Sequence, residues 1–381
     1  MANVFAKRPV VITRGKGALL WDINGKEYVD CMGSYGVALL GHSHQKVVAA
    51  VCKQAEKLIS CHASLYNNKR TEFLQKLVSI TPKGLNKAFL SNSGAESVEC
   101  AIKLARKYTG KPEIITVMGA FHGKTMGALS ATWDKKYREP FEPLVPEFTH
   151  VPPDNLEKLT EAFTDKTAAV LLEPIRGEGG VRVPPSAFLP GVRKICNEKD
   201  VLLILDEVQT GFGRTGRFFA CEHWGVTPDI MCLAKPFAGG LPIGITVAKE
   251  HVMSALKIGE HSSTFSGSPL VCAAACAAID SLVKDKLADR AANLGGYFKA
   301  KLEELQDKYK IVREVRGLGL MLGMELRYDV RNIILKTMNR GVLILDAGRN
   351  VLRFLPPLII EKEQINKTIS ILDEVIGEEE K

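Results

Sequence analysis

The chain has 381 residues, of which 46% are hydrophobic and 25% charged, and its formal net charge is +8 at pH 7. This length allows a large α/β domain plus a smaller one, and the composition is that of an ordinary globular protein. No apolar run approaches the ~20 residues of a membrane helix, and the N-terminus lacks the apolar core of a signal peptide. We therefore expect a cytoplasmic protein without membrane association.

The basic residues are dispersed rather than grouped in arginine tracts, which argues against a nucleic-acid partner. A positive field does suit an acidic substrate or an acidic carrier protein. Nine cysteines are scattered without a C-x-x-C pair, as expected for small core residues in a reducing compartment. Cys221 and His223 have no second Cys/His pair at a zinc spacing, so we expect no metal site.

Residues 3–40 predict short extended segments joined by turns. Asn24-Gly25 between apolar flanks predicts a type I′ hairpin, and Gly33-Ser34-Tyr35-Gly36 predicts a loop. The apolar spacing after these turns predicts an amphipathic helix over 46–59.

A short strand over 88–90 leads into a candidate anion site. Ser93 followed by Glu96 is a capping-box pattern, and the apolar spacing behind it predicts a helix that ends near Gly110. Ser93-Gly94-Ala95 would then form a turn at a helix N-terminus, where free amides and the helix dipole favour phosphate. Many helices begin in this way without a ligand, so the pattern alone is weak.

Two glycine-rich segments imitate nucleotide-binding motifs. GAFHGKT, 119–125, has three residues instead of four between its first glycine and Gly-Lys-Thr, and no periodic helix clearly follows it. GFGRTG, 211–216, matches G-x-G-x-x-G, but no convincing helix opens there. Neither segment predicts a nucleotide site.

Strands and helices alternate between residues 114 and 248, which indicates a parallel, multiply wound sheet. Strands are expected over 114–117, 168–174, 201–205, 230–235 and 243–248, with a helix over 188–199. The apolar run 201–205 is typical of a strand buried on both faces, and it ends in Asp206 and Glu207. The next strand ends in Lys235, and ligands bind at this edge of open α/β sheets. The carboxylate needs a cationic partner, and a lysine between apolar strands can act as an amine nucleophile.

The character of the chain changes at about residue 284, after an Ala-rich helix expected over 270–283. We predict a large domain over 45–283 and a smaller α+β domain formed by 284–381 together with 1–44. Extended segments are expected over 312–323 and 351–357, and a closing helix over 361–376. Arg353 stands in an apolar strand and should have a carboxylate partner.

These features together fit one chemistry. A phosphate turn, an aromatic residue after a strand, a buried aspartate and a strand-end lysine are the parts that hold pyridoxal phosphate. In this order the chain resembles the class III pyridoxal-phosphate aminotransferases over nearly its full length. The motifs are SNSGAES (91–97), FHGKT (121–125), EPIRGEGG (173–180), LILDEVQTGFGRTG (203–216), LAKPFAGGLPIG (233–244), STFSGSP (263–269) and RFLPPL (353–358).

WDKKYREPFEPLV (133–145) and VREVRGLGLMLGMELR (312–327) look closest to archaeal members of the acetylornithine aminotransferase branch. Some of these act on lysine or ornithine precursors carried on the small acidic protein LysW. The resemblance implies a fold-type I pyridoxal-phosphate transferase, whose large domain has a mostly parallel seven-stranded sheet, and a homodimer. It also implies transfer of the terminal amino group of an Nα-blocked lysine or ornithine to 2-oxoglutarate, in lysine or arginine biosynthesis.

The resemblance also assigns the site. Lys235, the Schiff-base lysine and proton shuttle, and Asp206, the partner of the ring nitrogen, are the implied catalytic residues. The implied cofactor-binding residues are Gly94, Ala95, Phe121, Asp206, Glu207, Val208, Gln209, Lys235 and, toward the partner subunit's phosphate, Thr264. The implied substrate-binding residues are Lys124, Ser263, Tyr35, Glu178 and Arg353. Glu178 and Arg353 resemble a gating pair, in which the glutamate masks the arginine for the amine and releases it for 2-oxoglutarate.

Two positions depart from the branch. Lys124 stands where arginine is usual, and a lysine keeps the charge but loses the bidentate fork. Because putrescine aminotransferase-like members also have lysine there, a diamine or 4-aminobutyrate transaminase is the alternative, and Tyr35 is a compensating carboxylate contact. Arg176 replaces a usual glutamine, and we expect it near the mouth of the site, within reach of an acidic carrier. A non-catalytic protein of this fold is the remaining alternative.

Overall fold

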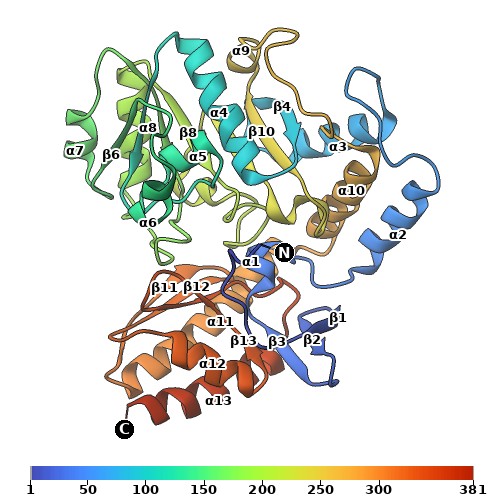
Figure 1. Ribbon diagram of the computed structural model, residues 1–381, viewed down its shortest axis with the longest axis vertical. Coiled ribbons are helices and arrows are strands. Elements are labelled where there is room, and N and C mark those ends of the chain that lie inside the picture. The colour runs from blue at the N-terminus through green and yellow to red at the C-terminus, as the bar shows by residue number, and fades with distance from the viewer. Residues whose placement is uncertain (1, 381) are drawn as a thin grey trace.

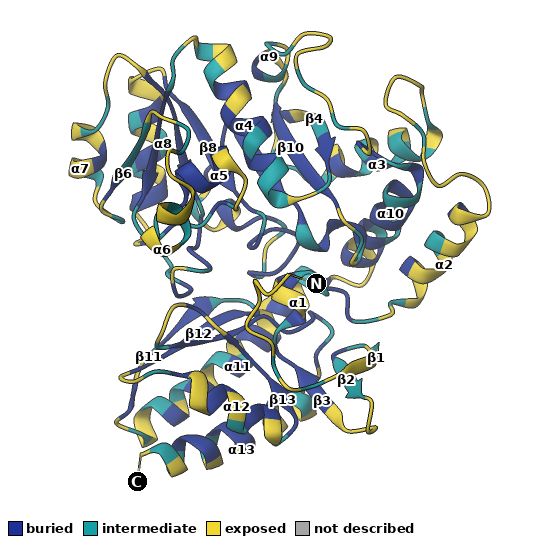
Figure 2. Ribbon diagram, viewed as in Figure 1, coloured by how far each residue is buried: buried dark blue, intermediate teal, exposed yellow. Residues whose placement is uncertain are grey.

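The computed structural model describes residues 2–380, which form two lobes (Figure 1). Within these residues the larger lobe contains a seven-stranded sheet and the smaller lobe two four-stranded sheets. Buried residues are concentrated in the strands and on the inner sides of the helices (Figure 2). None of the described helices is long and apolar enough to cross a bilayer.

The seven-stranded sheet is mostly parallel, as predicted. Its order is β4 (Leu85–Ser91), β10 (Gly244–Lys249), β9 (Ile230–Leu233), β8 (Leu202–Asp206), β7 (Thr167–Leu172), β5 (Glu113–Val117) and β6 (Phe148–Val151). The five strands from β9 to β6 run parallel, whereas β10 is antiparallel to both of its neighbours. The carboxyl ends of the parallel strands therefore share one edge of the sheet.

Strand β8 is central and completely buried, which explains its unbroken apolar sequence. Successive side chains point to opposite faces of a strand, so Ile204 joins a core with helix α4 (Gly94–Thr109). Leu203 and Leu205 join the opposite core, with α8 (Phe188–Glu198). The sheet is thus covered on both faces. The other helices of this lobe are α2 (Gln45–Ala55), α3 (Asn68–Ile80), α5 (Met126–Ala131), α6 (Lys135–Arg138), α7 (Leu156–Glu161), α9 (Glu250–Met253) and α10 (Pro269–Lys284), with 3₁₀ turns at Glu139–Phe141, Ala220–Trp224 and Lys235–Ala238.

The smaller lobe combines the two ends of the chain. Strands β1 (Ile12–Lys16), β2 (Leu19–Asp22) and β3 (Glu27–Asp30) pair with β13 (Val342–Leu343), which runs parallel to β3. The other sheet has the order β11 (Val312–Leu318), β12 (Met321–Leu326), β15 (Val351–Phe354) and β14 (Leu345–Asp346). Helices α11 (Leu287–Lys308), α12 (Arg331–Asn339) and α13 (Lys362–Glu379) pack beside these strands (Figure 1). We propose domain boundaries at residues 44/45 and 283/284, beside the start of α2 and the end of α10.

Several local predictions need correction. The hairpin between β2 and β3 is not a type I′ turn, because Asn24 lacks the positive φ that this turn requires. The Asp22 carboxylate instead accepts from the amides of Asn24 and Lys26 and closes a longer loop. Residues 33–36, labelled α1 (Gly33–Gly36), form a left-handed turn in which all four residues have positive φ, in keeping with the expected loop. Helix α2 ends at Ala55 rather than at residue 59.

Candidate active site

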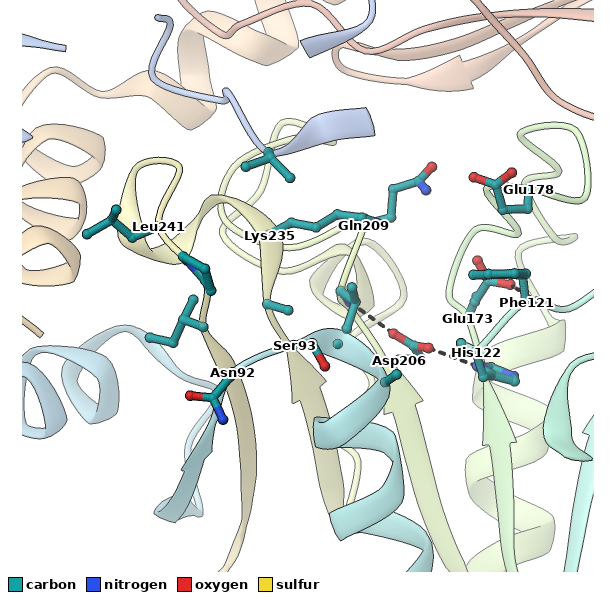
Figure 3. A pocket seen from close by; sticks show the side chains of 18 of the residues that line it. Asn92, Ser93, Phe121, His122, Glu173, Glu178, Asp206, Gln209, Lys235 and Leu241 are labelled. Carbon is teal, nitrogen blue, oxygen red and sulfur yellow. Dashed lines mark hydrogen bonds and ion pairs between the residues drawn. The ribbon is translucent and has the colours of Figure 1, made fainter. Parts of the chain in front are cut away.

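A cavity of about 420 Å³ opens at the carboxyl edge of the large sheet, where Val37 of the N-terminal segment closes one side. Figure 3 shows its walls, which come from the ends of β4, β5, β7, β8 and β9. Among the lining residues are eight that the sequence predicted, namely Gly94, Ala95, Phe121, Glu178, Asp206, Val208, Gln209 and Lys235. Residues far apart in the chain thus converge on one site.

The N-terminus of α4 forms one end of the cavity. Ser93 caps the helix by accepting from the Glu96 amide at 3.2 Å, and Gly110 ends it in a left-handed conformation, as predicted. The Glu96 carboxylate reaches the Asn92 amide rather than that of Ser93, so the capping box is incomplete. A Cβ on Gly94 would lie 2.7 Å from Val208 Cγ1, which explains the glycine. The free amides of this turn suit a phosphate group.

Asp206 lies at the end of β8 with its carboxylate facing the cavity (Figure 3). Its Oδ1 accepts from the Val208 amide at 3.1 Å, and its Oδ2 lies 2.8 Å from His122 Nδ1. The His122 ring, fully buried, reaches Thr116 Oγ1 through Nε2 at 3.3 Å. His122 is a site residue that the sequence reasoning missed, although it stands inside the FHGKT motif. It orients the carboxylate that must meet a cation.

Lys235 begins the 3₁₀ turn Lys235–Ala238, two positions after Leu233, the last residue of β9, and its backbone has a φ of 46°. Burial lowers the pKa of Lys235, while Glu178 and Asp206 act in the opposite direction. A lowered pKa makes more of the neutral amine available, and the neutral amine is the nucleophilic form.

Arg353 has the carboxylate partner that the sequence predicted. Its Nη1 lies 2.6 Å from Glu178 Oε1 and 3.3 Å from Gln209 Oε1. Its guanidinium carbon lies 5.7 Å from the centroid of the Tyr35 ring, which is 50% exposed. The side chain is otherwise fully buried, and Nε has no hydrogen-bond acceptor. The guanidinium thus keeps a spare donor behind Glu178 and Gln209, the two partners that line the cavity.

Two predicted residues are placed differently from expectation. Glu207 does not line the cavity, because its carboxylate turns away to accept from the Ala220 and Cys221 amides and from Thr210. It stabilises the loop behind β8 instead. Arg176 is 7% exposed and forms a bidentate pair with Asp154 at 3.0 and 3.1 Å, so the expectation that it meets a carrier is wrong.

The remaining predicted residues lie around the cavity rather than on its wall. Lys124 is exposed, with its ammonium 4.8 Å from the centroid of the Tyr137 ring. Ser263 Oγ accepts from Asn92 Nδ2 at 2.9 Å, and Thr264 is exposed on the following loop. The proposed roles of these residues and of Tyr35 in binding substrate or a partner's cofactor stay predictions.

Glu173 is a second residue that the sequence reasoning left without a role. It follows β7, lines the cavity and accepts from two backbone amides, that of Phe121 at Oε1 and that of Gly177 at Oε2. Burial raises the pKa of Glu173 to about 7. A carboxylate close to the end of the strand expected over 168–174 was the one signal available in the sequence; in the structure Glu173 directly follows β7.

Comparison with known proteins agrees with the site. The family model for "Aminotransferase class-III" matches residues 2–376. An acetylornithine aminotransferase of Methanocaldococcus jannaschii is 48% identical, over 99% of this chain and 96% of its own length. A [LysW]-aminoadipate semialdehyde transaminase of Deinococcus radiodurans is 46% identical, over 99% of this chain and 88% of its own. The ornithine aminotransferase structure from Toxoplasma gondii superposes with a TM-score of 0.96 at 36% identity, covering 100% and 94% of the two chains.

The residues present fit pyridoxal phosphate. The α4 turn suits the phosphate, Phe121 and Val208 both line the cavity, Asp206 offers an anion for the ring nitrogen, and Lys235 offers an amine. The chain therefore belongs to the class III aminotransferase family and is a pyridoxal-phosphate-dependent aminotransferase of the transaminase class.

Proposed function

We propose that this enzyme transfers the terminal amino group of an Nα-blocked ornithine or lysine to 2-oxoglutarate, giving a semialdehyde and glutamate in arginine or lysine biosynthesis. The names of its relatives support this reaction, since they are an acetylornithine aminotransferase and a [LysW]-aminoadipate semialdehyde transaminase. The observation that carries the proposal is the ion pair between Arg353 and Glu178 at the cavity.

This ion pair suits an enzyme with two unlike substrates. While Glu178 neutralises Arg353, the buried guanidinium has its counter-charge and the cavity accepts the uncharged chain of the amine donor. If Glu178 swings away, the guanidinium can pair with the carboxylate on the reacting carbon of 2-oxoglutarate, which the amine donor lacks, because arginine binds carboxylates bidentately. Glu178 is 28% exposed and Arg353 only 1%, so the glutamate is the partner with room to move.

Pyridoxal phosphate, when bound, supplies an electron sink for the carbon that carries the amino group. The chain supplies the rest. The α4 turn binds the phosphate, Asp206 holds a proton on the ring nitrogen, and Lys235 Nζ takes up and returns the proton of the reacting carbon. Phe121 and Val208, which both line the cavity, would contact the ring and exclude water from it.

A donor panel tests the proposal. We expect kcat/KM with 2-oxoglutarate to be highest for acetylornithine or the carrier-linked amine, and much lower for free ornithine, putrescine and 4-aminobutyrate. The net charge of +8 favours an acidic carrier, so activity on the carrier-linked amine should fall with added salt. Equal activity on free acetylornithine and the carrier-linked amine, without a salt effect, would exclude the carrier. Highest activity on putrescine would overturn the proposal.

Lys124 favours a second candidate, a diamine transaminase, because it lacks the arginine fork for an α-carboxylate. The Lys124→Arg variant separates the two. For a donor with a free α-carboxylate, we expect kcat/KM to rise by about tenfold, since a bidentate charged pair adds roughly 1.5 kcal/mol. Putrescine turnover should not change. An unchanged kcat/KM for both donors would show that residue 124 does not contact the substrate. Its exposed position over the Tyr137 ring would then account for that result.

We also propose that the enzyme works as a cytoplasmic homodimer. The exposed loop around Thr264 and Phe265 fits an interface in which Thr264 reaches the phosphate site of a second copy. Thr264→Ala should then weaken cofactor affinity in the dimer, as measured by titration of the apoenzyme.

A further inference from the structure

The partly buried carboxylate of Glu173 links two parts of the cavity that are separate in sequence. Its Oε1 accepts from the Phe121 amide at 2.9 Å and its Oε2 from the Gly177 amide at 3.0 Å. Phe121 is the aromatic wall of the cavity, and Gly177 immediately precedes the gate residue Glu178. One carboxylate therefore holds the backbone of both Phe121 and Gly177, the residue that precedes Glu178.

The loop that carries Glu178 has a second anchor in the smaller lobe. Arg316 Nε donates to the Gly180 carbonyl at 2.8 Å, and Arg316 is itself paired with Glu325 at 2.8 Å. Glu178 thus stands between two fixed points, one at Gly177 and one at Gly180. Releasing one of them gives the Glu178 carboxylate more freedom to leave Arg353, without touching either member of the pair.

We propose that Glu173 is a positioning residue that couples the Glu178 gate to the Phe121 wall and so sets the preference of the site between amine donor and dicarboxylate acceptor. This inference rests on the gate in the function proposed above. It differs from that function in assigning control of the gate to a residue that touches neither Glu178 nor Arg353.

The surroundings of Glu173 explain why a carboxylate is kept there. Burial and the neighbouring Asp206 carboxylate raise its pKa to about 7, against the opposing effect of His122 and the two amides. Burying a carboxylate costs free energy, yet it is retained here because only the ionised group can accept a hydrogen bond from an amide at each of its two oxygens. Glutamine has the same shape, but its NH₂ group would face one of the two amides as a second donor.

The test uses Glu173→Gln in the holoenzyme. We expect the gate to open more readily, so glutarate, a dicarboxylate probe, should bind about five- to tenfold more tightly in calorimetry, as one lost hydrogen bond of ~1 kcal/mol predicts. The ratio of kcat/KM for the amine donor to that for 2-oxoglutarate should fall by a similar factor. Because the single glutamine oxygen cannot hold both amides at once, the Phe121 anchor is weakened as well, and the apoenzyme should bind pyridoxal phosphate severalfold more weakly.

Two control variants make the result specific. Glu178→Gln should increase glutarate affinity without weakening the cofactor. Glu113→Gln removes another buried carboxylate, at the opposite end of β5, where it accepts from three threonines. That variant should change neither quantity. Glu173→Asp keeps the charge but is one methylene too short to reach both amides, so it should show smaller effects in the same direction. If Glu173→Gln does not fold, the same two affinities are measured on Glu173→Asp instead.

Unchanged glutarate and cofactor affinities in folded Glu173→Gln would overturn the coupling, and so would equal changes in Glu113→Gln. Glutarate binding does not depend on which amine is the natural donor. A different donor in the panel would therefore refute the proposed substrate and leave this test intact.

Discussion

Replacing Lys235 with alanine is expected to abolish amino transfer, lowering kcat by about 10⁴-fold or more, because one amine supplies both the nucleophile and the proton carrier. The lysine follows β9 and is partly buried at the cavity, and burial lowers its pKa, so it is prepared for both roles. The measurement is glutamate formation from 2-oxoglutarate under saturating donor. The visible absorbance of the covalently attached cofactor should disappear in parallel.

A lysine on the surface provides the comparison. Lys87 lies on β4 and pairs with Glu250 at 3.1 Å in an exposed ion pair, which contributes little. Lys87→Ala should leave both kcat and the absorbance near the parent values. If Lys235→Ala retained the visible band and a substantial rate, another amine would have to be the nucleophile, and the assignment of this site would be wrong.

The backbone of the site follows from the local pattern of the sequence. The five apolar residues before Asp206 specify a buried strand, and Ser93 with Gly110 specifies the two ends of α4. Both patterns act over a few residues, so they can be recognised without knowing the fold. The mostly parallel sheet and the position of Asp206 and Lys235 at its carboxyl edge follow from the alternation of strands and helices.

What the sequence does not reveal is the direction of side chains within a fixed element. Asp206 is the last residue of β8 and Glu207 follows it, yet only the Asp206 carboxylate faces the cavity, and the local pattern does not show which of the two does so. Arg176 was expected at the mouth, but its bidentate partner Asp154 is supplied by the loop after β6. His122 and Glu173 were missed for the same reason, because their partners come from other strands. The family resemblance supplied the pairing of Glu178 and Arg353, which are 175 positions apart.

The second large effect is expected for Asp206→Asn. Asparagine keeps the shape and can still accept from the Val208 amide, but its NH₂ group then occupies the position of Oδ2, beside His122 and the cavity. The NH₂ group, a hydrogen-bond donor, would then face the ring nitrogen, where an anion is needed to keep that nitrogen protonated. Losing the anion from a buried ion pair costs about 3–5 kcal/mol, which corresponds to roughly a 10²–10⁴-fold loss in kcat.

Asp229→Asn is the matched control, since Asp229 is also a buried aspartate. It forms ion pairs with Arg193 at 2.7 Å and Lys249 at 2.6 Å, and it lies just before β9, on the edge of the sheet away from the cavity. This variant should lower the unfolding temperature without a comparable loss in kcat for the folded enzyme. The Asp206→Asn enzyme should behave in the opposite way, staying folded while losing turnover. A cofactor analogue with a permanently cationic ring nitrogen, N-methylated pyridoxal phosphate, should restore part of its rate, because the positive charge then no longer depends on a protein anion. Failure of this rescue in a folded variant would mean that Asp206 orients the site through His122 rather than by its charge.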